Sequence, residues 1–193
     1  MAEPYTLGAY WGPRASSADE NAARLAGFLG DVADTGPMLS GWRPKADSRS
    51  VSAVTVEADQ ADQADQASLS QLLKAGRNRR DVGGEVVEEL GYAEALYAAP
   101  VPDRLMTALV EVWDPDWCTW ISSRLRRAQQ VRPGKAQVGW LTWVHADLSD
   151  LGGPAGVQPL AAGSLLRLGD SPGAVATDDV SAPATLLGAG RNT

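Results

Sequence analysis

The amino-acid sequence predicts an α+β fold, with an antiparallel or mixed sheet and about three main helices in a single domain. The chain has 193 residues, of which 44% are hydrophobic, and this is enough to bury one core without disulfides or metals. Segments with helical spacing of apolar residues and segments rich in aromatic and β-branched residues follow one another without a regular βαβ rhythm. We expect one domain over residues 1–188 and a frayed tail over residues 189–193.

The chain begins with a predicted strand and a long helix. Tyr5–Trp11 mixes aromatic residues with Leu and Thr, as strands do, and Gly12–Pro13 ends it. Ser17 and Glu20 have the spacing of a capping box, in which each side chain bonds to the backbone N–H of the other residue. Gly36–Pro37 predicts the end of the helix. Between these signals the apolar residues recur at helical spacing: Leu25, Phe28, Leu29 and Val32.

The middle of the chain carries weaker signals. Val51–Val56 has a weak strand pattern, and Ala58–Gln66 repeats Ala-Asp-Gln three times, which is typical of a solvated linker or a helix extension. A second capping-box spacing predicts a short helix over Ser68–Gly76. Glu85–Leu90 is interpreted as one or two helical turns, and Tyr92–Ala98 as a strand.

The second half begins with a third helix. Asp103 is placed to cap a helix over Arg104–Trp113, and Asp114 precedes Pro115, which disfavours helical backbone there and ends the helix. The later segments are then assigned from composition. Strands are predicted at Cys118–Ile121, Val138–Val144 and Leu165–Leu168, loops at Gly152–Pro159 and Ser171–Gly173, and a weak final helix near Val180–Leu187.

Charge and cysteine usage bound the function. The net charge of −7 argues against a nucleic-acid binder and against attachment to an anionic membrane surface. It suits a basic partner, and it also suits plain solubility. The one cysteine, Cys118, cannot form an internal disulfide, so we expect a reducing compartment. Met1–Gly12 shows no signal peptide and no apolar run is long enough to span a bilayer, so we expect a cytoplasmic protein.

Catalytic and metal-binding motifs are missing from the sequence. A catalytic triad or a zinc site has only His145 and Cys118 to draw on, and Cys118 lies in an aromatic segment that favours a buried, inert thiol. Asp114 and Asp116 flank Pro115, which is typical of turn chemistry more than of a Mg²⁺ pair. No phosphate-binding glycine loop is present. We therefore predict no enzyme activity, no cofactor and no metal.

Several motifs occur in a characteristic order. The chain reads YTLGAYWGPR over Tyr5–Arg14, then Gly76–Asp81 (GRNRRD), Glu89–Tyr92 (ELGY), Val112–Trp117 (VWDPDW) and the Trp-rich Gly139–Val144. In this order they resemble the immunity protein 52 family of bacterial polymorphic toxin systems. The resemblance extends from Tyr5 to about Leu168. The tripled Ala-Asp-Gln segment departs from the family as a local expansion.

The resemblance implies a protein-binding function. Members are encoded beside a toxin, often one with a restriction-endonuclease-like nuclease domain, and they bind and neutralise it without being enzymes. A nuclease holds anionic DNA on a cationic face, which an acidic partner is able to occlude. Our candidate toxin contacts are exposed acids and one aromatic anchor. They are Glu85, Glu88, Glu89, Asp114, Asp116 and Trp117.

Two other functions stay open at this point. An uncharacterised small hydrolase or transferase would need Cys118, His145 and an acid within hydrogen-bond reach of one another. A scaffolding subunit of a larger assembly would need an exposed apolar patch. For the candidate contacts, the ordinary alternative is that the acids are simply solvated and that Trp117 belongs to the core.

Overall fold

The computed structural model describes residues 5–12, 15–35, 42–44, 56–58, 85–90, 97–129, 136–149, 156–181, 183–184 and 187. The chain divides into two compact units, which we describe one at a time. Unit 1 combines Met1–Ala9, Glu88–Ala98 and Asp116–Thr193, and unit 2 combines Tyr10–Val87 and Ala99–Pro115. Helices and strands occur in both, which confirms the α+β class.

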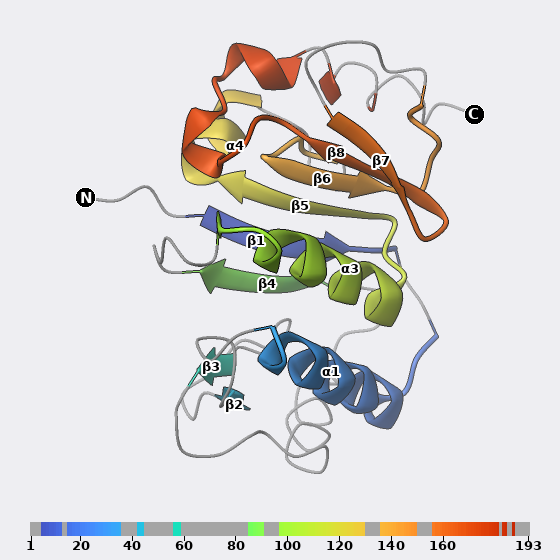
Figure 1. Cartoon of the computed structure of the whole chain (residues 1–193). Coiled ribbons are helices and arrows are strands. Elements are labelled where there is room, and N and C mark those ends of the chain that lie inside the picture. The colour runs from blue at the N-terminus through green and yellow to red at the C-terminus, as the bar shows by residue number, and fades with distance from the viewer. Residues whose placement is uncertain are drawn as a thin grey trace. The chain divides into compact units, whose positions relative to one another are not determined.

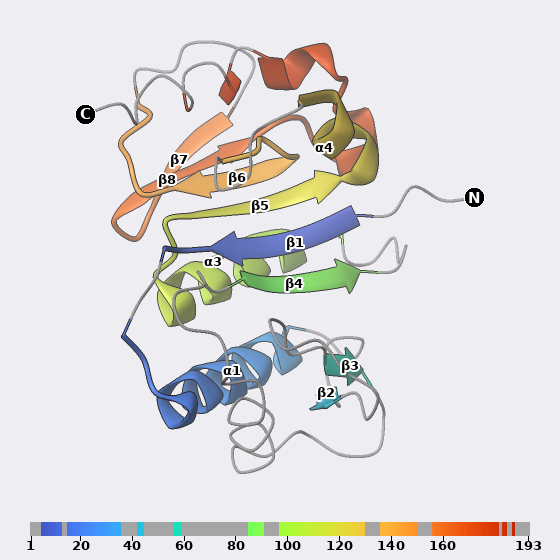
Figure 2. The ribbon, with the colours of Figure 1, turned by 180° about the vertical axis from the view of Figure 1, so that it is seen from behind.

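Unit 1 is built on a six-stranded sheet with the order β4-β1-β5-β6-β8-β7. The view from behind shows β1 between β4 and β5 (Figure 2). The pairs β5–β6, β6–β8 and β7–β8 are antiparallel. The strands are β1 (Tyr5–Tyr10), β4 (Glu85–Leu90), β5 (Trp117–Ser122), β6 (Leu141–Val144), β7 (Gly156–Leu160) and β8 (Gly163–Arg167).

The middle strands of this sheet are buried on both faces. Every residue of β5 and β6 is buried, including the polar Thr119, Ser122 and Thr142, so neither strand alternates between a buried and an exposed face. Trp120 of β5 and Trp140, just before β6, cross edge to face with ring centroids 5.5 Å apart, and Tyr97 lies against both. The indole N–H of Trp143 donates to the backbone oxygen of Leu160 at 3.0 Å. The large aromatic residues are therefore the core of unit 1.

A short helix, α4 (Ser123–Gln129), follows β5 without a loop. The Ser122 hydroxyl accepts a hydrogen bond from the backbone N–H of Leu125 and so caps its first turn. At the other end the Gln129 amide bonds to both the backbone N–H and the backbone C=O of Val138, at 2.8 and 2.6 Å. These contacts fix the segment that leads into β6.

Unit 2 contains two long helices, α1 (Ala18–Ala33) and α3 (Val101–Trp113), which pack against each other (Figure 1). It also contains the short antiparallel pair β2 (Trp42–Pro44) and β3 (Val56–Ala58). The capping box at Ser17 is present as predicted, and the predicted apolar face of α1 is buried. Asp103 is not the cap of α3, because the helix begins two residues earlier at Val101 with Pro100 as its N-cap.

Two predicted assignments are wrong. Glu85–Leu90 is the strand β4 and not a helical turn, because pairing with β1 outweighs the helix propensity of its glutamates. Gly152–Pro159, predicted as a loop, contains most of β7, because an edge strand tolerates the proline that a central strand excludes.

Other assignments shift at their ends. The strand predicted over Val138–Val144 begins only at Leu141, and Ser171–Gly173 runs into a 3-10 turn at Pro172–Ala174. A second 3-10 turn covers Asp178–Val180. The short helix predicted at Ser68–Gly76 and the Ala-Asp-Gln repeat after Ala58 lie outside the described residues, as do most of the strand patterns predicted at Val51–Val56 and Tyr92–Ala98.

Candidate functional site

Two tryptophans join the N-terminal motif to the end of α3. Trp11 follows β1 in the YWG motif, and Trp113 closes α3 in the VWDPDW motif. Their rings stack with centroids 5.2 Å apart and an angle of 12° between the planes. Residues of two motifs about a hundred positions apart in the sequence thus meet in unit 2, where Trp11 is held against the end of α3.

Unit 2 also carries an acidic cleft of about 370 Å³. The C-terminal end of α1 and the outer surface of α3 line it. Its members are Asp31, Asp34, Thr35, Asp103, Arg104, Thr107, Ala108 and Glu111. Four of these eight residues are acidic and one is basic, so the cleft has a net negative charge. We call this surface the acidic cleft.

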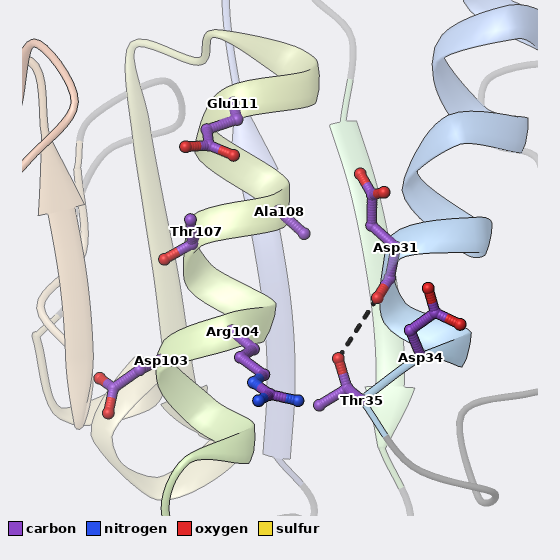
Figure 3. A pocket seen from close by; sticks show the side chains of 8 residues that line it. All are labelled: Asp31, Asp34, Thr35, Asp103, Arg104, Thr107, Ala108 and Glu111. Atoms are coloured by element: carbon purple, nitrogen blue, oxygen red, sulfur yellow. Dashed lines mark hydrogen bonds between the residues drawn. The ribbon is translucent and has the colours of Figure 1, made fainter.

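The close view separates the α3 residues into two rows (Figure 3). Asp103, Thr107 and Glu111 lie along one side of the helix, while Arg104 and Ala108 lie on the side that faces α1. Both rows follow from a spacing of four residues, which places side chains one above the other on a helix. The cleft therefore offers carboxylates together with hydroxyl groups.

The end of α1 is held by local bonds. The Thr35 hydroxyl donates to the backbone oxygen of Asp31 at 3.3 Å, and the Thr35 backbone N–H donates to the Val32 oxygen (Figure 3). Asp34 is the C-cap, with its backbone N–H directed at the Gly30 oxygen. These bonds satisfy the carbonyl groups of Gly30, Asp31 and Val32, and the side chains of Asp31 and Asp34 are exposed.

Three of the four carboxylates of the cleft sit where helix electrostatics disfavours them, whereas Asp103 lies in the first turn of α3, where the dipole favours an anion. Asp31 and Asp34 lie at the C-terminal end of α1, Glu111 lies in the last turn of α3, and neither last turn carries a basic residue. The C-terminus of a helix is the negative end of its dipole, where each anion costs about 0.3–1 kcal/mol at low salt. Helix stability therefore does not account for Asp31, Asp34 and Glu111.

The structure places the candidate toxin contacts in three different settings. Glu85, Glu88 and Glu89 lie on β4, at an edge of the sheet. Asp114 is exposed as the C-cap of α3, in the left-handed backbone conformation that Asp tolerates well, with φ of 43°. Asp116 is half-buried and Trp117 is buried, with 6% exposed. Trp117 thus offers a partner little area, and toxin contact by the five acids stays a prediction.

Sequence reasoning missed the cleft itself. Its four acids belong to two segments, 31–34 and 103–111, that are about seventy residues apart. Two features of the sequence could have indicated an acidic surface. Polar residues recur every three or four positions on the outer side of two amphipathic helices, and acids lie at both helix ends. That signal indicates an exposed acidic stripe, but only the packing of α1 on α3 joins two stripes into a cleft.

The thiol and the imidazole that covalent catalysis would need differ in burial: the thiol is buried and the imidazole is exposed. Cys118 is fully buried in β5, and desolvation raises the pKa of its thiol far above the usual range, so it stays protonated. His145 is exposed after β6, with its ring edge to face against Trp143. A protonated, enclosed thiol is not a nucleophile, and this counts against the hydrolase hypothesis.

The described part of the chain shows neither a metal cluster nor a membrane span. Within it, no three residues of the His, Cys, Asp and Glu types are grouped so as to hold a metal ion. No helix there combines the length and apolar character needed to cross a membrane.

These features define a small α+β protein whose described residues include an acidic cleft and a pair of stacked motif tryptophans, both in unit 2. In a comparison with protein families, residues 3–91 match Immunity protein 52, which confirms the resemblance predicted from the motifs over that part of the chain. The match takes in all of unit 2 except Ala99–Pro115. The later motifs, including the VWDPDW segment, lie beyond it. No curated protein matches the chain.

Proposed function

We propose that this protein binds a cognate polymorphic toxin and neutralises it by occluding the toxic domain. The observation that carries the proposal is the match to the immunity protein 52 family over residues 3–91. The acidic cleft supports it, because a protein that works by binding needs an exposed surface with a definite charge. The buried, protonated Cys118 supports it as well, because it leaves the alternative of a thiol-dependent enzyme without its nucleophile.

We further propose that the toxic domain is a nuclease of the restriction-endonuclease-like kind. The support is electrostatic. A nuclease binds DNA through a cationic face, and a chain with a net charge of −7 is attracted to such a face at long range. Rapid, tight capture is what neutralisation requires, since pairs of DNases with their immunity proteins reach dissociation constants of about 10⁻¹³ M or below. The producing cell needs this protection where its DNA lies, so we place the protein in the cytoplasm.

Co-expression tests the function. The toxin domain encoded beside this gene is induced in a bacterial host with and without this chain. We expect growth arrest and DNA degradation in its absence and normal growth in its presence. A version of the chain with a stop codon early in α1 controls for expression load. Persistent killing with the folded chain present at comparable levels would overturn the proposal.

Binding is measured separately with purified proteins. The two are mixed and passed over a size-exclusion column, and the dissociation constant is then measured at two salt concentrations. We expect a stable complex whose association rate falls as salt rises, because screening shortens the range of attraction. Adding plasmid DNA to the mixture tests the mode of action. Cleavage should stop at one equivalent of this chain.

A further inference from the structure

We propose that Pro159 closes the outer edge of β7 against strand addition, so that this edge does not pair with the same edge of a second copy of the chain. Among the described strands, β7 ends the six-stranded sheet and forms a hairpin with its neighbour β8 (Figure 1). An edge strand presents a row of unpaired N–H and C=O groups, which is a template for pairing with another chain. The inference concerns self-association and does not depend on the proposed function.

The direction of the backbone groups in β8 follows from a bond just beyond the strand. The backbone N–H of Leu168 donates to the Trp140 oxygen at 2.8 Å, on the side of β8 where β6 lies. Backbone groups alternate in direction along an antiparallel strand, so residues at even spacing from Leu168 point the same way. Ser164 and Leu166, which lie opposite residues of β6, therefore direct their N–H and C=O groups at β6 and not at β7.

Val157 and Pro159 hold the outward positions of β7. They lie opposite Leu166 and Ser164 of β8. Because those two residues direct their backbone groups at β6, Val157 and Pro159 direct theirs away from β8, to the outer edge of the sheet. Proline has no N–H, so Pro159 offers this edge a C=O group without a donor. A second strand would therefore find a donor at Val157 and none at Pro159.

The hairpin has few other features that would prevent pairing. Natural edge strands are blunted by charged side chains, by bulges, by short length or by proline. Residues 156–163 (GVQPLAAG) contain no charged residue, and the register of β7 with β8 runs through the strand without a bulge. The side chains of β7 are exposed or half-buried throughout its five residues. With Pro159 replaced, β7 would be an uncharged, exposed segment of the kind that favours pairing between chains.

Substitutions at two neighbouring positions test the inference. Pro159→Thr and Pro159→Ala both restore an outward N–H, and threonine also favours strands. The matched control is Gln158→Thr, which adds a strand-favouring residue at the adjacent exposed position, where the backbone faces β8. Self-association of the full chain is measured by sedimentation velocity and light scattering over a range of concentrations. We expect Pro159→Thr to associate at least about tenfold more tightly than wild type, Pro159→Ala less strongly, and Gln158→Thr within about twofold of wild type.

Two further measurements separate edge pairing from association caused by unfolding. The melting temperature and the near-UV circular dichroism of each variant report whether the buried tryptophans of unit 1 stay packed. Amide hydrogen exchange reports on the edge itself. The Val157 N–H points away from β8, so it should exchange rapidly in wild type and become protected in Pro159→Thr as the protein concentration rises.

Association of folded Pro159→Thr that protects the Val157 amide supports the closed edge. If Pro159→Thr does not fold, Pro159→Ala carries the same comparison. The inference is overturned if the folded Pro159 variants associate no more than Gln158→Thr, or if they associate while the Val157 amide still exchanges as fast as in wild type. A protected Val157 amide in wild type would also overturn it, because the edge would then already be occupied.

Discussion

The two units of this protein differ in where their characteristic side chains lie: the aromatic residues of unit 1 are buried, and the carboxylates of unit 2 are exposed. In unit 1 the central strands β5 and β6 are wholly buried, and they contain the buried Trp117, Trp120 and Trp143, with the buried Trp140 just before β6. In unit 2 the helices α1 and α3 bury one side and expose another that is rich in carboxylates at unfavourable helix ends. Aromatic packing tolerates little change, whereas exposed charge is free to vary with a partner. The comparison indicates that the described chemistry of unit 1 is buried aromatic packing, whereas unit 2 combines a buried helix interface with exposed charge.

The largest expected effect on stability comes from adding a methyl group to a glycine in the core of unit 1. A Cβ at Gly139 would fall on the backbone oxygen of Trp120, and one at Gly163 would fall on that of Val144. Backbone atoms cannot move aside cheaply, so Gly139→Ala and Gly163→Ala should each lower the free energy of unfolding by about 3 kcal/mol or more. Urea denaturation followed by tryptophan fluorescence measures this loss.

The matched control lies in unit 2. At Gly30, inside α1, an added Cβ meets nothing within 4 Å. Alanine favours the helix over glycine by about 0.5–1 kcal/mol, so Gly30→Ala should stabilise the protein. Equal destabilisation by Gly30→Ala and Gly139→Ala would remove the contrast between the two units.

The next largest effect is a difference in stability between substitutions at two buried tryptophans of unit 1. The Trp143 N–H donates to the Leu160 oxygen, whereas the Trp120 N–H is buried without a hydrogen-bond partner among the described residues. Replacing either ring by phenylalanine removes similar packing, but only Trp143→Phe also leaves a carbonyl unsatisfied. We expect Trp143→Phe to cost about 1–2 kcal/mol more than Trp120→Phe in thermal or urea unfolding. The reverse order would contradict the hydrogen-bond assignment.

A smaller effect is expected at the start of α1. The Ser17 hydroxyl accepts from the Glu20 backbone N–H at 3.1 Å, and loss of such a cap costs about 1 kcal/mol. Ser17→Ala should therefore lower the free energy of unfolding by this amount, while Ser17→Asp should retain it, as measured by chemical denaturation.

The smallest effect is a dependence on pH. The backbone N–H of Ser17, and then its hydroxyl, hold the pKa of the Glu20 carboxyl below its usual range, with a further contribution from Arg24. A lowered pKa in the folded state contributes stability above the unfolded pKa, and this is lost as pH falls through the folded pKa. The stability difference between wild type and Glu20→Gln should therefore shrink from neutral pH into the acid range. A difference that does not change with pH would contradict this.

The sequence predicted the elements that depend on neighbouring residues. The capping box at Ser17, the buried face of α1 and the helix stop at Asp114 before Pro115 all act within one or two turns, and all are present. It failed at β4 and β7. For β4, the local preference of EVVEEL is helical, and the strand exists only through its pairing partner. For β7, an edge position makes room for Pro159.

For function, the motif order in the sequence was enough to indicate the immunity protein family, and residues 3–91 confirm that resemblance. The net charge is also known from the sequence. The sequence does not show where the negative charge gathers, because composition does not say which carboxylates share a surface. Tertiary packing decided this. It buried Trp117, stacked Trp11 on Trp113, and brought Asp31 and Asp34 to the same cleft as Glu111. Contacts between residues about seventy positions apart leave no local pattern, so the cleft exists only in the folded protein.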